Sequence, residues 1–274
     1  MDTPNKRSIP SMTTTLIFPG SRSKTTKDGL ARAYEGSSIL SLTTSSGYRV
    51  DLLFGVGLPS AEHPSLCASK MLYLLYFYGN GMCLETSSFE FAHFRKLGFN
   101  VLITEYPGYG VSRGQPSESG CYEAADAAYH YLTEVLHVHH TQIVVSGWSL
   151  GAAVAINLAS RKQVAGLIAF SAFTNIPEQA SVLLPWIPQS VVRLLIKERF
   201  DNLSKIRQVT CPILICHGIQ DELVPFAMAE RLAQAARQNS PVTFFPIQGC
   251  GHNEIFEVGG NQLWTAIQNF TMNL

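Results

Sequence analysis

The sequence has little charge of either sign, no long apolar run and no cysteines at metal-ligand spacing. Only 15% of its 274 residues are charged, and 20 basic residues balance 20 acidic residues to a formal net charge of +0. Nucleic-acid-binding domains carry a concentrated basic surface, so this balance argues against a nucleic-acid partner. The expected partner is a small molecule or an acyl substrate, and the oligomeric state is left open.

The longest apolar stretch covers about residues 71–78. It is far shorter than the roughly 20 residues that a helix needs to cross a bilayer. The N-terminus also lacks the apolar segment of a secretory signal. We therefore expect no integral membrane segment and a cytoplasmic protein. Targeting to an organelle stays open, because residues 3–27 contain five basic residues, many Ser and Thr, and no acid.

The cysteines are scattered and none forms a metal-binding pair; they are Cys67, Cys83, Cys121, Cys211, Cys216 and Cys250. We expect free thiols in a reducing compartment. The sequence predicts no metal site and implies no organic cofactor.

From about residue 38, strand patterns alternate with helix patterns. Residues 38–44 and 49–55 flank a Ser-Ser-Gly turn and predict an opening antiparallel pair. Six apolar segments rich in branched or aromatic residues predict strands buried on both faces: 71–78, 100–106, 142–146, 164–170, 212–217 and 242–246. Helical spacing lies between or after them at 86–97, 121–136, 150–159, 225–237 and 261–270. This order predicts an α/β fold with a mostly parallel central sheet and helices on both faces.

One interval interrupts the alternation. Between about residues 175 and 206 no strand is predicted, and apolar side chains gather around Trp186 between prolines. We predict a small helical cap inserted into a single domain, residues 35–274, which follows an N-terminal arm, residues 1–34. Residues 3–27 of this arm are expected to be solvated, although residues 12–20 could pack on the domain. Two roles for the cap stay open. It covers an acyl chain of short to medium length, or its apolar side chains only cover the sheet.

Residues 147–151 read Gly-Trp-Ser-Leu-Gly, between the predicted strand 142–146 and the predicted helix 150–159. This is the setting of a nucleophile elbow, a sharp turn that exposes a serine. A side chain at Gly147 or Gly151 would collide with neighbouring backbone in such a turn. The pattern predicts Ser149 as a nucleophile. The alternative is a glycine-rich turn that happens to contain a serine.

A serine hydroxyl needs a base to take its proton and a carboxylate to orient that base. Asp221 and His252 each follow a predicted strand, 212–217 and 242–246. The C-terminal ends of parallel strands meet at one edge of a sheet, so both side chains are expected near Ser149. The chain order Ser, Asp, His is also that of α/β-hydrolases.

Each assignment has an alternative. Asp221 could cap the helix that follows it, and Glu222 is the second candidate acid. His252 could be an ordinary turn histidine, although Gly249 and Gly251 favour a loop shaped to present it.

Acyl transfer also needs hydrogen-bond donors for an oxyanion. The first parallel strand runs into the glycine-rich turn 78–82 at the same edge of the sheet, and we expect the backbone N–H groups of Asn80 and Leu150 to be these donors. A phosphate-binding loop is the competing interpretation, but the Lys and the Ser or Thr of a P-loop are missing. The candidate substrate pocket consists of Tyr78, Gly81, Met82, Trp148 and Trp186.

Together these motifs resemble the bud-emergence-like branch of the α/β-hydrolase superfamily, which is similar to serine aminopeptidase-like and other abhydrolase-domain hydrolases. The resemblance rests on residues 78–80, 105–114, 147–151, 217–221 and 251–253. It implies Ser149 as nucleophile, Asp221 as acid and His252 as base. The chain departs from the family at Tyr78, where the family usually has His.

The resemblance and the residues together predict a carboxylesterase-like serine hydrolase. It would cleave a carboxylic ester, thioester or amide through an acyl-enzyme. The alternatives are an aminopeptidase-like peptidase and a non-catalytic binding protein of the same fold, since a fold does not fix a function.

Overall fold

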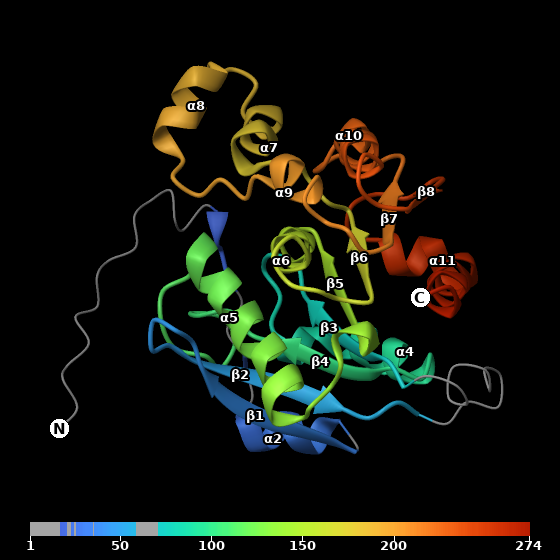
Figure 1. The fold of residues 1–274 in the computed structure, drawn as a ribbon. Coiled ribbons are helices and arrows are strands. Elements are labelled where there is room, and N and C mark those ends of the chain that lie inside the picture. The colour runs from blue at the N-terminus through green and yellow to red at the C-terminus, as the bar shows by residue number, and fades with distance from the viewer. Residues whose placement is uncertain (1–16, 21–22, 25, 35, 59–70) are drawn as a thin grey trace.

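A computed structural model describes residues 17–20, 23–24, 26–34, 36–58 and 71–274 (Figure 1). Its centre is an eight-stranded sheet with the order β1-β2-β4-β3-β5-β6-β7-β8. The strands are β1 (Ser37–Thr43), β2 (Arg49–Gly55), β3 (Tyr73–Phe77), β4 (Asn100–Thr104), β5 (Ile143–Trp148), β6 (Gly166–Phe170), β7 (Ile213–Gly218) and β8 (Val242–Ile247). Cys67, one of the cysteines expected to have a free thiol, lies outside the described residues.

The sheet is mostly parallel, as predicted. β2 pairs antiparallel with β1 and β4, and every other pair from β4 through β3 to β8 is parallel. All residues of β4, β6 and β7 are buried, which explains why these strands are continuous apolar runs rather than alternating ones.

Helices connect the parallel strands and flank the sheet. They are α2 (Lys27–Ala33), α4 (Ser88–Lys96), α5 (Glu118–His130), α6 (Leu150–Ala159), α7 (Ile176–Leu183), α8 (Gln189–Leu195), α9 (Asn202–Ile206), α10 (Phe226–Ala236) and α11 (Ile255–Met272). A 3-10 turn, Leu84–Ser87, precedes α4; a π turn, Tyr131–Val135, follows α5; and a 3-10 turn, His140–Gln142, precedes β5. α11 starts six residues before the predicted helix. Gly260, at φ +45°, interrupts its helical backbone. The helical spacing of the residues after this break therefore does not extend to the first turns of α11.

The described part of the N-terminal arm packs partly on the domain, as was left open for residues 12–20. Leu30 on α2 is only 1% exposed, and Lys27 forms an ion pair with Asp51 on β2. Phe18 is also buried in the core. An isolated short helix is marginal in water, so α2 depends on this packing. Residues 1–16 lie outside the described part.

Three helices, α7, α8 and α9, occupy the interval between β6 and β7 where the cap was predicted. α7 packs on α8, and Figure 1 shows both projecting beyond the end of the sheet at which β6 and β7 finish. Trp186, in the turn between them, is 73% exposed. Trp186 therefore does not cover the sheet, and the role of covering an acyl chain stays a prediction. No helix in the described ranges combines the length and apolarity needed to span a bilayer.

Candidate active site

The turn between β5 and α6 holds Ser149 in an unusual backbone conformation. Its φ is 53° and its ψ is −111°, a region that residues other than glycine rarely occupy. The Ser149 N–H donates to the carbonyl of Phe170 at the end of β6, at 2.9 Å. The turn is therefore tied to the neighbouring strand as well as to its own helix.

The two glycines of the motif allow backbone segments to touch. A Cβ atom at Gly147 would lie 2.1 Å from the carbonyl oxygen of Gly151. A Cβ atom at Gly151 would lie 1.9 Å from the carbonyl oxygen of Phe77 on β3. The steric reason expected for both glycines is thus present, and the turn packs directly against the central strand.

Ser149, His252 and Asp221 lie in one continuous hydrogen-bonded chain. His252 Nε2 is 3.0 Å from Ser149 Oγ, and His252 Nδ1 is 2.7 Å from Asp221 Oδ2. A carboxylate only accepts, so Nδ1–H donates to Asp221 and the neutral imidazole keeps Nε2 as an acceptor for the hydroxyl proton. The arrangement can take a proton from Ser149.

The carboxylate of Asp221 is held ionised. Its Oδ1 accepts from the backbone N–H groups of Leu223 and Val224, at 3.0 and 2.7 Å. Burial opposes ionisation, but hydrogen bonds from His217, His252 and the Val224 N–H outweigh it and hold the pKa of Asp221 well below its usual range. A negative charge therefore faces the imidazole at neutral pH.

The competing roles for these residues are not what the structure shows. α10 begins after Pro225 with no side chain bonded at its N-cap, so Asp221 does not cap that helix. The side chain of Glu222 is exposed, whereas that of Asp221 is fully buried against His252. Asp221 is thus the acid that contacts the histidine.

His217 is a contact that sequence reasoning missed. It is fully buried at the end of β7, where its Nε2–H donates to the carbonyl of Val224 at 2.8 Å. The same nitrogen lies 3.2 Å from Asp221 Oδ2, the oxygen that His252 also contacts. A histidine at a strand end four residues before a candidate acid was the available signal.

The turn that follows β3 lies beside the elbow. β3 pairs with β5, with Phe77 opposite Gly147, and a Cβ atom at Gly79 would lie 2.5 Å from the ring of Trp148. Within the described chain, the backbone N–H groups of Asn80 and Leu150 donate to no other group. Both N–H groups therefore remain available as donors.

Glu105 is a second residue that sequence reasoning missed. Its buried carboxylate accepts from the N–H groups of Leu84, Val111 and Ser112 at 3.0, 2.7 and 3.0 Å. Burial raises the pKa of Glu105 to about 7, although these N–H donors act in the opposite direction. One carboxyl group thus joins the loop after β3 to the loop after β4. An acid directly after an apolar strand was the signal.

The predicted pocket residues are placed in three different settings. Tyr78 is a core residue, because its ring is fully buried against Tyr106 and its hydroxyl accepts from the Tyr106 N–H at 3.3 Å. Trp148 is partly exposed, with its ring 5.5 Å from that of His252. Gly81 is exposed and Met82 is partly buried in the turn, while Trp186 lies on the projecting α7–α8 turn.

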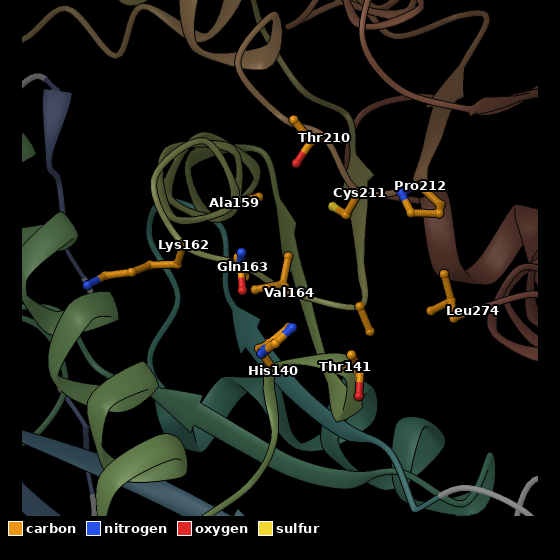
Figure 2. Close-up of a pocket in the computed structure, with 11 residues that line it drawn as sticks. His140, Thr141, Ala159, Lys162, Gln163, Val164, Thr210, Cys211, Pro212 and Leu274 are labelled. Atoms are coloured by element: carbon orange, nitrogen blue, oxygen red, sulfur yellow. The ribbon is translucent and has the colours of Figure 1, made fainter.

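A cavity of about 340 Å³ lies at the end of the sheet opposite to Ser149. Figure 2 shows its lining, which includes His140, Cys211 and Leu274. Cys211 precedes β7, so this cavity is at the N-terminal ends of the strands and away from Ser149. Within the described ranges, no group of three or more His, Cys, Asp or Glu side chains is arranged to hold a metal ion.

Known proteins share both the sequence pattern and the fold. The model of the alpha/beta hydrolase family matches residues 79–202. Alpha/beta hydrolase domain-containing protein 17B of Xenopus tropicalis is 30% identical over 232 residues, which cover 84% of this chain and 74% of that protein. An uncharacterized protein of Mycobacterium tuberculosis is 36% identical over 174 residues, 64% of this chain, and the match spans 60% of that relative's length.

Among solved structures, the Pyrococcus furiosus esterase Pf2001 superposes with a TM-score of 0.73 over 93% of this chain and 96% of the esterase. The two sequences are 16% identical, so this likeness concerns the fold.

Proposed function

Because the chain belongs to the alpha/beta hydrolase family, we propose that it is a serine hydrolase that cleaves a carboxylic ester, thioester or amide through an acyl-enzyme. The observation that carries this proposal is the hydrogen-bonded chain from Ser149 through His252 to Asp221. It stands at a strand-turn-helix elbow, where a serine is exposed to a substrate.

In the proposed reaction, His252 Nε2 takes the Ser149 proton as Oγ attacks the substrate carbonyl carbon. The imidazolium that forms is stabilised by the ionised Asp221 carboxylate, which also fixes the ring. His252 then returns the proton to the leaving group, and the acyl-enzyme remains. Water, activated by the same imidazole, releases the acid and restores Ser149.

The tetrahedral oxyanion needs donors that are in place before it forms. The N–H groups of Leu150 and Asn80 are free of partners in the described chain and belong to the elbow and to the turn beside it. Leu150 is also the first residue of α6, whose N-terminus favours negative charge. We assign both groups to the oxyanion hole.

A fluorophosphonate probe tests the assignment, because it forms a covalent bond only with an activated serine. We expect labelling at one residue, complete loss in Ser149→Ala, and normal labelling in Ser160→Ala, which alters the other end of α6. Turnover of p-nitrophenyl acetate should fall by about 10⁴-fold or more in Ser149→Ala. Equal labelling of wild type and Ser149→Ala would falsify the proposal.

The same protein distinguishes the alternatives. A non-catalytic binding protein would take no label and turn over no substrate. A peptidase would prefer aminoacyl amides with a free amine over acyl esters and thioesters of similar size, so a matched substrate panel separates the two activities.

A further inference from the structure

The helical pair α7–α8 carries an unusual concentration of exposed apolar side chains. Within the described chain, fourteen large apolar side chains are exposed, and six of them lie in one stretch of this pair: Val182, Leu183, Trp186, Val191, Leu194 and Leu195. Leu194 is 84% exposed and Trp186 is 73% exposed. Such a concentration of exposed apolar side chains is a candidate binding surface. We call residues 182–195 the apolar hairpin.

The hairpin is fixed to the body of the protein at its base. Gln179 donates a hydrogen bond to the carbonyl of Leu223, and Glu178 forms an ion pair with Arg231 on α10. On the return side, Glu198 accepts from the backbone N–H of Glu118 at 2.8 Å. The hairpin therefore has a set direction, with its apolar side chains turned outward.

Buried Asn202 at the start of α9 adds a second anchor. Its backbone N–H donates to the carbonyl of Thr174 at 2.9 Å, and its side-chain amide donates to the carbonyl of Phe173 at 2.9 Å. These two hydrogen bonds thus fix the segment between β6 and α7 to the start of α9.

The loop that holds the candidate acid also has exposed apolar side chains. Leu223, bonded to Gln179 at the hairpin base, is 41% exposed, and Ile219 in the same loop is 37% exposed. These two residues flank Asp221 along the chain. Exposed apolar side chains thus occur both on the hairpin and in the loop that holds the candidate acid.

The charge on the hairpin and on the two residues that follow it, 196–197, has one sign. Between Glu178 and Glu198 the sequence has no acid, while Arg193 and Lys197 are both exposed. The two flanking glutamates are engaged with the protein body. Although the whole chain is neutral, this projection is a local site of positive charge beside apolar surface.

We propose that the apolar hairpin docks on the surface of an anionic lipid bilayer. Apolar side chains would enter the boundary between headgroups and acyl chains, where Trp is favoured, and Arg193 and Lys197 would meet lipid phosphates. A second copy of the chain fits less well. A two-fold contact through this surface would bring the cations of both copies together without an acid in the hairpin to pair them.

Vesicle co-sedimentation tests the docking. The protein is used as Ser149→Ala, so the result does not depend on the proposed hydrolase function. Vesicles contain phosphatidylcholine alone or an equal mixture with phosphatidylglycerol. We expect the protein to bind the mixed vesicles. Adding Leu194→Asp places a charge in the face that would enter the bilayer, so partitioning into the vesicles should fall about tenfold. Met272→Asp, at a 55% exposed site on α11, is the matched control and should bind normally.

Two further measurements define the contact. Arg193→Gln together with Lys197→Gln should remove the preference for phosphatidylglycerol. The fluorescence emission of Trp186, obtained as the difference between the protein and its Trp186→Phe variant, should shift to the blue on vesicle addition. Thermal unfolding of each variant checks that the fold is intact.

Three results would overturn the proposal. The first is failure of the folded protein to bind the mixed vesicles. The second is equal binding by Leu194→Asp and its parent. The third is a dimer in solution that Leu194→Asp dissociates, combined with no vesicle binding, because a second copy would then be the occupant.

Discussion

The elbow around Ser149 with its helix α6 and the apolar hairpin contain similar apolar residues, but these residues are buried in the first and mostly exposed in the second. All ten residues of α6 are buried, and backbone atoms of the elbow and of the end of β3 leave no room for a Cβ atom at Gly147 or Gly151. In α8, by contrast, Val192 is the buried residue. The position of Ser149 is thus determined by many contacts at once, whereas the hairpin is determined by anchors at its base. Substitutions should be costly at the first and tolerated at the second.

The largest expected effect is on the chemistry of the elbow. Asp221→Asn keeps the size of the side chain but removes the charge that orients and stabilises the imidazole, so kcat for p-nitrophenyl acetate should fall by about 10⁴-fold. The neighbouring Glu222→Gln is the control, and its kcat should stay near that of wild type. A large loss in Glu222→Gln instead would identify the other acid.

The next effect is on folding. Gly151→Ala places a Cβ atom where the Phe77 carbonyl oxygen lies 1.9 Å away, and neither backbone segment can move freely. We expect a loss of about 4 kcal/mol in the free energy of unfolding, measured by urea denaturation. Ser160→Ala at the end of the same helix should cost no more than about 1 kcal/mol. Equal losses would mean that the elbow is not as tightly packed as described.

A pH-dependent effect is expected at Glu90 on α4, whose Oε2 is buried with no hydrogen-bond partner in the described chain. Burial raises the pKa of Glu90 from 4.5 to about 7. The folded state therefore binds this proton more tightly, and the wild type loses stability as the pH rises from about 5 to 8. Glu90→Gln should remove about 3 kcal/mol of that loss.

Urea denaturation of both proteins at the two pH values measures this difference, and Glu257→Gln, at an exposed site on α11, is the control. Parallel stability curves for wild type and Glu90→Gln would contradict the assignment.

A smaller effect is expected at His217, which we propose as a positioning residue for Asp221. His217→Leu removes the donor to the carboxylate and should lower kcat by about 10 to 100-fold with little change in KM. His217→Gln keeps an N–H donor and should recover most of the loss. If both variants lose activity equally, or if KM alone changes, the role of His217 is only structural.

The smallest effect is expected on the hairpin. Leu194→Asp should change the free energy of unfolding by no more than about 0.5 kcal/mol, because its side chain is already exposed. Leu214→Asp on β7 is the contrast: that side chain is fully buried, and we expect loss of the folded state. A marked destabilisation by Leu194→Asp would show that the hairpin is covered in solution.

The sequence was most informative where structure depends on neighbouring residues. The strands, the elbow and the placement of Asp221 and His252 after their strands follow from local patterns and from the geometry of a parallel sheet. The contacts that join the three side chains agree with that expectation, while their roles remain our proposal. Their order along the chain and their arrival at one edge were sufficient signals.

The rest depends on which segments meet in three dimensions. A sequence pattern places His217 near Asp221 and Glu105 after a strand, but it does not show which groups these side chains contact. The exposure of Trp186 could not be predicted, because a cluster of apolar residues between prolines does not say whether anything covers it. α2 was missed because its stability comes from packing against β1, not from its own seven residues.

The anchoring of Asn202 has a mechanical consequence. Ser149 is bonded through its N–H to Phe170, and only a few residues separate Phe170 from the start of α7. Asn202 clamps this short connector at Phe173 and Thr174. We therefore expect a load on the hairpin to pass into α9 and the body of the domain before it reaches Ser149.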